Sequence, residues 1–171
     1  MRINRIDISV AVFSGLACLG LLCDIPVWAL FIGWTWYVVL GNKPSAFGKV
    51  LPAMAMGYLM AGVSVITYEA FHYNIWSLVI AVGVTSLMLM YSFKIPFFNC
   101  SMAAFNAYSC MFAGYYTGSF PASTNVALYD INNVIRAILW IAMANLIGMC
   151  IGWLSTYIGE LGTKKDEDPE D

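Results

Sequence analysis

Charged residues are scarce in this sequence, and their scarcity excludes an ordinary soluble domain. Asp, Glu, Lys and Arg make up 11% of the 171 residues, whereas 61% are hydrophobic, and the mean hydropathy is +0.75. Such a composition is typical of an integral membrane protein. The apolar runs also lack the alternation of membrane β-strands. The sequence therefore predicts an all-α, polytopic integral membrane protein whose main partner is the lipid bilayer.

The groups that perform most chemistry are also missing from the apolar runs. The five cysteines lie inside those runs without a Cys-x-x-Cys or Cys/His spacing that would hold zinc, and His occurs once. No nucleophile–base pair or paired carboxylates occur at membrane depth. We therefore expect no enzyme activity, no metal and no cofactor, and we expect no nucleic-acid partner.

Six apolar runs are separated by turn residues and charges. Asp24 and Pro26 end the first run, Gly41 to Ser45 end the second, and Lys94 and Pro96 end the fourth. The second run is short for a bilayer, which needs about 20 helical residues. The predicted spans are residues 8–23, 27–40, 50–68, 76–93, 97–116 and 133–157.

The positions of the cations indicate how the helices are oriented. With a cytoplasmic N-terminus, six spans place every Lys and Arg except Arg136 on the cytoplasmic side. This distribution follows the positive-inside rule. Both termini are then cytoplasmic, including a charged tail at residues 161–171. Glu69 and His72 fall in an exterior turn, where we expect a solvated pair rather than a metal site.

A short aromatic stretch in the second run has a degenerate copy in the fifth run. Both copies begin with Phe, carry a small residue two positions later and a hydroxyl four positions later, and end with Gly. The matched pairs are Phe31 and Phe105, Gly33 and Ala107, and Thr35 and Ser109. The chain therefore reads as two three-helix repeats, residues 1–72 and 73–160.

An odd number of helices in each repeat makes the two repeats inverted with respect to the membrane. Small residues also recur at every fourth position in both repeats, which predicts faces where helix backbones approach closely. These helix-packing residues are Ala53, Gly57, Ala61, Ala144, Gly148 and Gly152. Homo-oligomer formation through such faces is left open.

Inverted repeats commonly place related helices around a central permeation path. The polar and aromatic residues of the duplicated stretch and of its surroundings are the candidates for lining such a path or binding a solute. They are Phe31, Trp34, Thr35, Asn99, Phe105, Asn106 and Ser109. Intramembrane Asn and Ser more often join helices than line a pore, so helix packing is the competing interpretation of these residues.

The same residues carry a resemblance to a known family. Phe31, Gly33 and Tyr37, the loop with Lys43 and Gly48, and the later stretch from Phe105 to Gly114 resemble domain-of-unknown-function family 1097. This family groups small bacterial inner-membrane proteins. The resemblance covers most of the chain and implies a multi-pass protein of the bacterial inner membrane. Asn106 and Ala107 depart from the family, which more often has an apolar residue and Gly there.

Two functions are consistent with these features. The first is a facilitative channel or transporter for a small uncharged or anionic solute, with its path at the interface of the repeats. The absence of ionisable residues from the middle of the spans argues against an energised transporter. The alternative is a non-transporting membrane scaffold, or a partner subunit that packs through its small-residue faces. Solute flux distinguishes the two.

Overall fold

The computed structural model describes residues 4–122 and 131–161, and these form helices and connecting turns without a β-strand. This confirms the all-α prediction. The predicted tail lies outside the described residues from position 162 onward, and the segment between the fifth and sixth predicted spans is described only as far as Ala122. The α-helices are α1 (Arg5–Ala17), α2 (Val27–Val39), α3 (Ser45–Ala70), α4 (Ile75–Ser92), α5 (Ser101–Tyr116) and α6 (Ile131–Leu161).

Helix ends coincide with residues that favour turns. Asp24 adopts a left-handed conformation after the 3-10 helix Cys18–Cys23, and Pro26 then precedes α2. Gly41 and Asn42 have positive φ after α2. The Asn74 side chain accepts a hydrogen bond from the backbone N–H of Trp76 and caps α4. The observed ends of α2 and α4 therefore lie within one residue of the predicted ends.

Several helix boundaries differ from the prediction. α1 begins at Arg5 rather than at residue 8, and α6 covers Ile131–Leu161 rather than 133–157. α3 begins at Ser45 rather than at residue 50, and it contains both Lys49 and Glu69. The prediction was wrong because a charge was interpreted as a boundary, although a long side chain can reach the headgroups from inside a helix. The fifth run divides into a short 3-10 helix, Pro96–Phe98, and α5.

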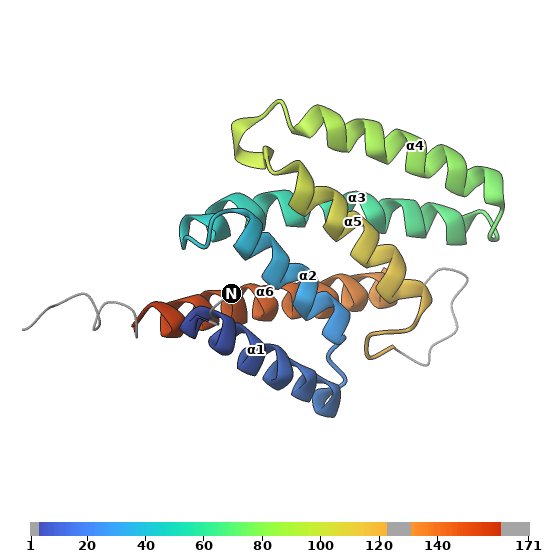
Figure 1. Ribbon diagram of the computed structural model, residues 1–171. Helices are drawn as coiled ribbons and strands as arrows, with labels where there is room; N and C mark the ends of the chain where they lie inside the picture. Colours follow the sequence, from blue (N-terminus) through green and yellow to red (C-terminus); the bar gives the residue numbers. More distant parts are fainter. Residues whose placement is uncertain (1–3, 123–130, 162–171) are drawn as a thin grey trace, which may run out of the picture. The chain divides into compact units, whose positions relative to one another are not determined.

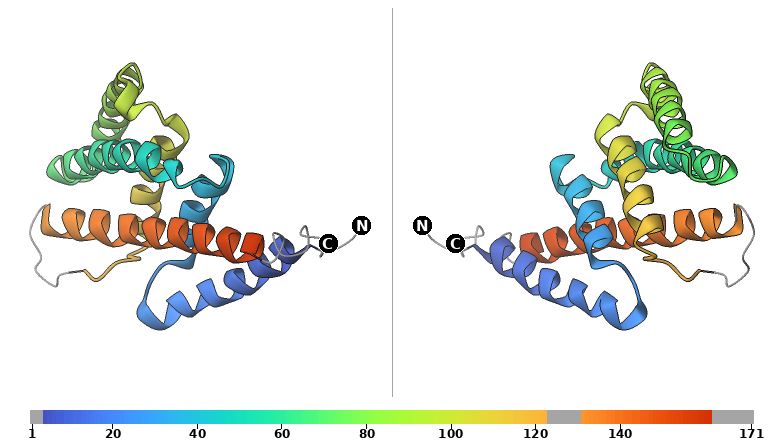
Figure 2. Two further views of the ribbon diagram at one scale, coloured as in Figure 1. Left: turned by 90° about the vertical axis from the view of Figure 1, so that its left-hand side faces the viewer. Right: turned by 90° about the vertical axis from the view of Figure 1, so that its right-hand side faces the viewer.

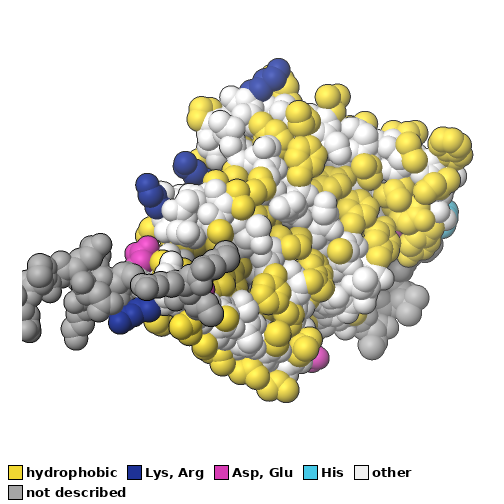
Figure 3. All heavy atoms as spheres, in the orientation of Figure 1, with side chains coloured by type: hydrophobic (Ala, Val, Ile, Leu, Met, Phe, Trp, Pro, Cys, Tyr) yellow, Lys and Arg dark blue, Asp and Glu magenta, His cyan; other side chains and the backbone are white. Residues whose placement is uncertain are grey.

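Among the described residues, four helical segments are long and apolar enough to cross a bilayer: Arg5–Cys23, which joins α1 to its 3-10 extension, and α3, α4 and α6. α2 is apolar but has 13 residues, and α5 has 16. Hydrophobic side chains are spread across the face shown in Figure 3, where charged side chains are few. These features indicate a membrane protein, whereas six spans stay a prediction.

The chain divides into two compact units that differ from the predicted sequence halves. The first unit, Met1–Ala46 with Ala144–Asp171, holds α1, α2 and the second part of α6. The second unit, Phe47–Met143, holds nearly all of α3, together with α4, α5 and the first part of α6. Figure 2 shows the same helices from two further sides.

In the first unit, α1 and α2 both contact the second part of α6 (Figure 1). The Ser9 hydroxyl on α1 donates a hydrogen bond of 2.7 Å to the carbonyl oxygen of Ser155 on α6. Near the end of α6, a Cβ at Gly159 would come within 2.9 Å of Ile6. Trp36, Tyr37 and Leu30 of α2 are fully buried in this unit.

In the second unit, α4 lies alongside α3, and α5 crosses α3 (Figures 1 and 2). The buried side chains include Tyr58 and Val65 of α3, Leu89 of α4 and Met111 of α5. Gly62 of α3 faces Ile138 in the first part of α6, because a Cβ at Gly62 would lie 3.1 Å from Ile138. Each unit thus has its own core, built around one crossing of a short helix over a long one.

Candidate functional site

The crossing of α2 over α6 in the first unit depends on glycine. A Cβ at Gly148 would overlap the carbonyl oxygen of Leu30, and a Cβ at Gly33 would overlap the carbonyl oxygen of Asn145. The two backbones are therefore in direct contact, which only the smallest residue permits. The Asn145 side-chain amide donates a hydrogen bond of 2.8 Å to the carbonyl oxygen of Ala29 at the same place.

The crossing of α5 over α3 in the second unit has the same construction. A Cβ at Gly57 would overlap the carbonyl oxygen of Ala104. Gly57 and Gly148 are equivalent positions of the two small-residue series, because they are as many residues apart as Ala53 and Ala144. Leu30 and Ala104 are likewise equivalent in the duplicated aromatic stretch, because they are as many residues apart as Phe31 and Phe105. The duplicated sequence elements therefore make equivalent backbone contacts within each unit.

Burial along α2 and α5 follows the same alignment. From Ala29 to Tyr37 and from Ala103 to Met111, every position has the burial class of its counterpart. The exposed positions coincide as well. Phe31 is 38% exposed and Phe105 is 40% exposed, and Thr35 and Ser109 are both exposed. The shared motif thus presents an aromatic ring and a hydroxyl on the face that points away from each unit's core.

The predicted site residues of α2 differ in burial: Phe31 and Thr35 are exposed, whereas Trp34 is buried. Phe31 and Trp34 stack with ring centroids 6.1 Å apart, but Trp34 is buried, and its ring covers Gly152. Thr35 donates its hydroxyl hydrogen to the carbonyl oxygen of Phe31 at 2.8 Å. The Thr35 oxygen keeps its capacity to accept a hydrogen bond from a ligand.

Three predicted site residues of the second unit lie in one recess. Asn99, Phe105 and Asn106 line a recess of about 480 Å³ together with Met90 of α4 and Phe93, which follows α4 directly. Phe93 and Phe105 meet edge to face at 5.8 Å. Ser109 lies on α5 but does not line this recess. The recess offers two amide side chains and two aromatic rings to a small polar molecule.

The predicted helix-packing residues are all buried, and three of them face an identified neighbour. Gly57 and Gly148 meet helix backbones, and Gly152 meets the Trp34 ring, which a Cβ would approach to 2.7 Å. The complete set is Ala53, Gly57, Ala61, Ala144, Gly148 and Gly152. Gly57, Gly148 and Gly152 therefore face the interior of their own units.

A cluster of three hydroxyls in the second unit has no signal in the sequence. The oxygens of Ser64, Thr85 and Tyr108 lie 2.8 to 2.9 Å from one another and join α3, α4 and α5. All three residues are buried. Thr85 also donates to the carbonyl oxygen of Ala81. Such a network satisfies the buried hydroxyls and fixes the register of three helices.

Glu69 corrects the expectation of a solvated turn. Glu69 belongs to the last turn of α3 and is 5% exposed, and its Oε1 accepts a hydrogen bond of 2.6 Å from the Tyr115 hydroxyl. His72 lies in the turn after α3 and is exposed, as expected. The sequence missed the burial of Glu69 because the partner, Tyr115, is distant in the chain.

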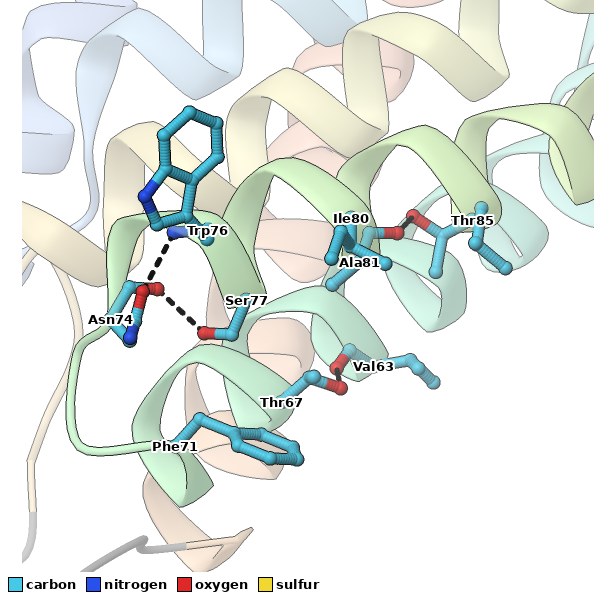
Figure 4. A pocket seen from close by; sticks show the side chains of 10 residues that line it. Val63, Thr67, Phe71, Asn74, Trp76, Ser77, Ile80, Ala81 and Thr85 are labelled. Atoms are coloured by element: carbon cyan, nitrogen blue, oxygen red, sulfur yellow. Dashed lines mark hydrogen bonds between the residues drawn. The ribbon is translucent and has the colours of Figure 1, made fainter.

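A second recess, of about 470 Å³, lies between the end of α3 and the start of α4 (Figure 4). Its hydroxyls are turned toward backbone carbonyls, since Thr67 donates to Val63 and Ser77 donates to Asn74. Phe71, Trp76 and Ile80 supply apolar walls. This recess suits a hydrocarbon group better than a polar solute.

The long apolar helices, with no β-strand in the described part of the chain, define the class of this protein: it is an all-helical membrane protein. The family follows from the sequence match. The model of the family described as protein of unknown function, DUF1097, matches residues 7–160, so the chain belongs to that family. This confirms the resemblance stated above. Searches of curated proteins and of solved structures gave no match.

Proposed function

We propose that this protein is a facilitative channel or transporter for a small uncharged or anionic solute. Its path would follow the interface of two inverted three-helix repeats in a bacterial inner membrane. Both termini would be cytoplasmic. The observation that carries the proposal is the glycine-to-carbonyl contact made once by Gly57 and once by Gly148, with partners at equivalent positions. Such internal duplication is common in proteins that move solutes through a central path.

The small-residue faces argue for transport over the scaffold alternative. A scaffold of the kind considered would use Gly57 and Gly148 to contact another protein. Both glycines instead lie against backbone of their own unit. A surface that is covered within the molecule is not available to a partner.

The side chains of the predicted path favour an uncharged solute over an anion. None of the seven predicted site residues carries a charge that would neutralise an anion. The amides of Asn99 and Asn106 and the hydroxyls of Thr35 and Ser109 match a neutral solute that donates and accepts hydrogen bonds.

Flux into proteoliposomes tests the proposal. Vesicles with the purified protein should swell faster than empty vesicles in a panel of small neutral solutes. Trimming both Phe31 and Phe105 to Ala should raise the rate several-fold, because two exposed rings would no longer narrow the path. Phe97→Ala is the matched control, since Phe97 is an exposed ring outside the duplicated motif. Equal swelling of protein-containing and empty vesicles would favour the scaffold alternative.

A further inference from the structure

Glu69 has an unusual environment for a carboxylate. Its Oε1 accepts a hydrogen bond from Tyr115, whereas its Oε2 is buried and has no hydrogen-bond partner. No Lys, Arg or His of the described chain forms an ion pair with it. A buried carboxylate oxygen without a partner is costly, so native proteins usually supply one. The unpaired oxygen therefore points to a ligand that donates hydrogen bonds.

Tyr115, the hydrogen-bond partner of this carboxylate, belongs to a cluster of four tyrosine rings. Tyr68 meets Tyr73 at 5.3 Å and Tyr116 at 6.4 Å, and Tyr115 meets Tyr116 at 5.6 Å, all with steep interplanar angles. Tyr115 links the cluster to Glu69 through its hydrogen bond to Oε1, and Tyr116 packs against Tyr115. Tyr73 and Tyr116 are 58% and 48% exposed, so the cluster reaches the surface.

We propose that Glu69 and these four tyrosines bind a small primary ammonium group. The carboxylate supplies the opposite charge, and tyrosine faces attract cations that come within about 6 Å of the ring centre. An ammonium has N–H donors for Oε2 and for the phenol oxygens, and it accepts none. A quaternary ammonium lacks these donors and would leave Oε2 unpaired. The site therefore discriminates by hydrogen bonding as well as by charge.

The ammonium site is separate from the helix crossing and from the proposed transport. Glu69 lies more than three turns beyond Gly57, about 18 Å along α3 at about 1.5 Å per residue. Glu160 follows Gly148 by the same spacing in the first unit, but it is exposed. The second unit alone therefore holds a buried carboxylate at this position.

A free amine and the headgroup of phosphatidylethanolamine both carry a primary ammonium, and one set of measurements distinguishes them. The thermal unfolding midpoint of the full-length protein in detergent is measured against methylammonium, tetramethylammonium and sodium at equal ionic strength. It is measured again with added phosphatidylethanolamine or phosphatidylcholine. A saturable rise with methylammonium identifies a free amine. A rise only with phosphatidylethanolamine identifies the lipid.

Glu69→Gln should weaken the response at least about tenfold, because it removes the charge while keeping an oxygen for Tyr115. Glu69→Asp, which keeps the charge but retracts it by one methylene, should weaken it as well. Glu160→Gln is the matched control and should respond as the parent does. The proposal is overturned if neither primary ammonium compound raises the midpoint, if quaternary compounds act equally, or if Glu69→Gln and Glu69→Asp both respond like the parent.

Discussion

The two units use the same backbone contact but surround it with different polar groups. In the first unit, Asn145 adds a hydrogen bond to the carbonyl oxygen of Ala29 at the crossing. Met54 stands at the equivalent position of the second unit and adds no such bond, whereas Tyr108 there joins a cluster of hydroxyls. The close approach of the helices is thus the shared feature, and polar contacts vary around it.

This difference has a physical basis. A carbonyl oxygen can lie directly against a helix backbone only where no Cβ is present, and glycine is the only residue without a Cβ. Hydrogen bonds inside a membrane protein are worth about 1 kcal/mol each and can be exchanged for packing. A duplicated fold can therefore change its polar contacts in one half but must keep the glycine in both.

The largest effect should come from filling either crossing. Gly57→Leu and Gly148→Leu should each destabilise the protein by about 3 kcal/mol or more, because a side chain would separate backbones in direct contact. Gly83→Leu is the control, since a Cβ at Gly83 meets nothing within 4 Å. Folded yield and unfolding midpoint in detergent measure the loss. If both crossing variants behave like the parent protein, the claim that each unit depends on a glycine at its helix crossing is contradicted.

Replacement of Asn145 should have a smaller effect that is confined to the first unit. Asn145→Leu removes the bond to Ala29 and leaves a buried carbonyl without it, at a cost of about 1 to 2 kcal/mol. Met54→Leu, the equivalent change in the second unit, should cost less than about 1 kcal/mol because it conserves apolar volume. Denaturant titration measures the free energy of unfolding of both variants. Equal losses of stability would contradict the claim that only the first unit has a polar contact at its crossing.

Loss of the Tyr108 hydroxyl should have the smallest effect. Tyr108→Phe keeps the ring and removes one member of the hydroxyl cluster, so we expect a loss of about 1 kcal/mol. Ser64 and Thr85 can still bond to each other. Tyr91→Phe is the control because Tyr91 is exposed. A change no larger than that of the control would mean that the cluster does not stabilise the second unit.

Much of the fold was predictable from local signals. Asp24, Pro26, Gly41 and Asn74 act on their own neighbours in the chain, so sequence was sufficient to place α2 and α4. The repeat of small residues at every fourth position similarly indicated which faces of α3 and α6 are buried. These features depend on spacing within one helix, and spacing is visible in a sequence.

The candidate sites were less predictable because they depend on partners distant in the chain. Nothing local indicates that Gly148 meets Leu30, or that Tyr115 holds Glu69. A glutamate near a predicted helix end looks solvated until its aromatic neighbours are known. Asn99, Phe105 and Asn106 are close in sequence, and here the prediction grouped residues that do line one recess.

The central claim is that the two repeats are inverted, and the sidedness of equivalent positions tests it most directly. Lys43 follows α2 and Thr117 follows α5 at the spacing of the duplicated motif, and both are exposed. Cysteine is introduced at each position after Cys18, Cys23 and Cys150, which are exposed, are replaced by serine. A membrane-impermeant maleimide is then added to sealed vesicles of known orientation. Inverted repeats predict labelling of Lys43→Cys only from the cytoplasmic side and of Thr117→Cys only from the opposite side. Labelling of both from the same side would contradict the inversion.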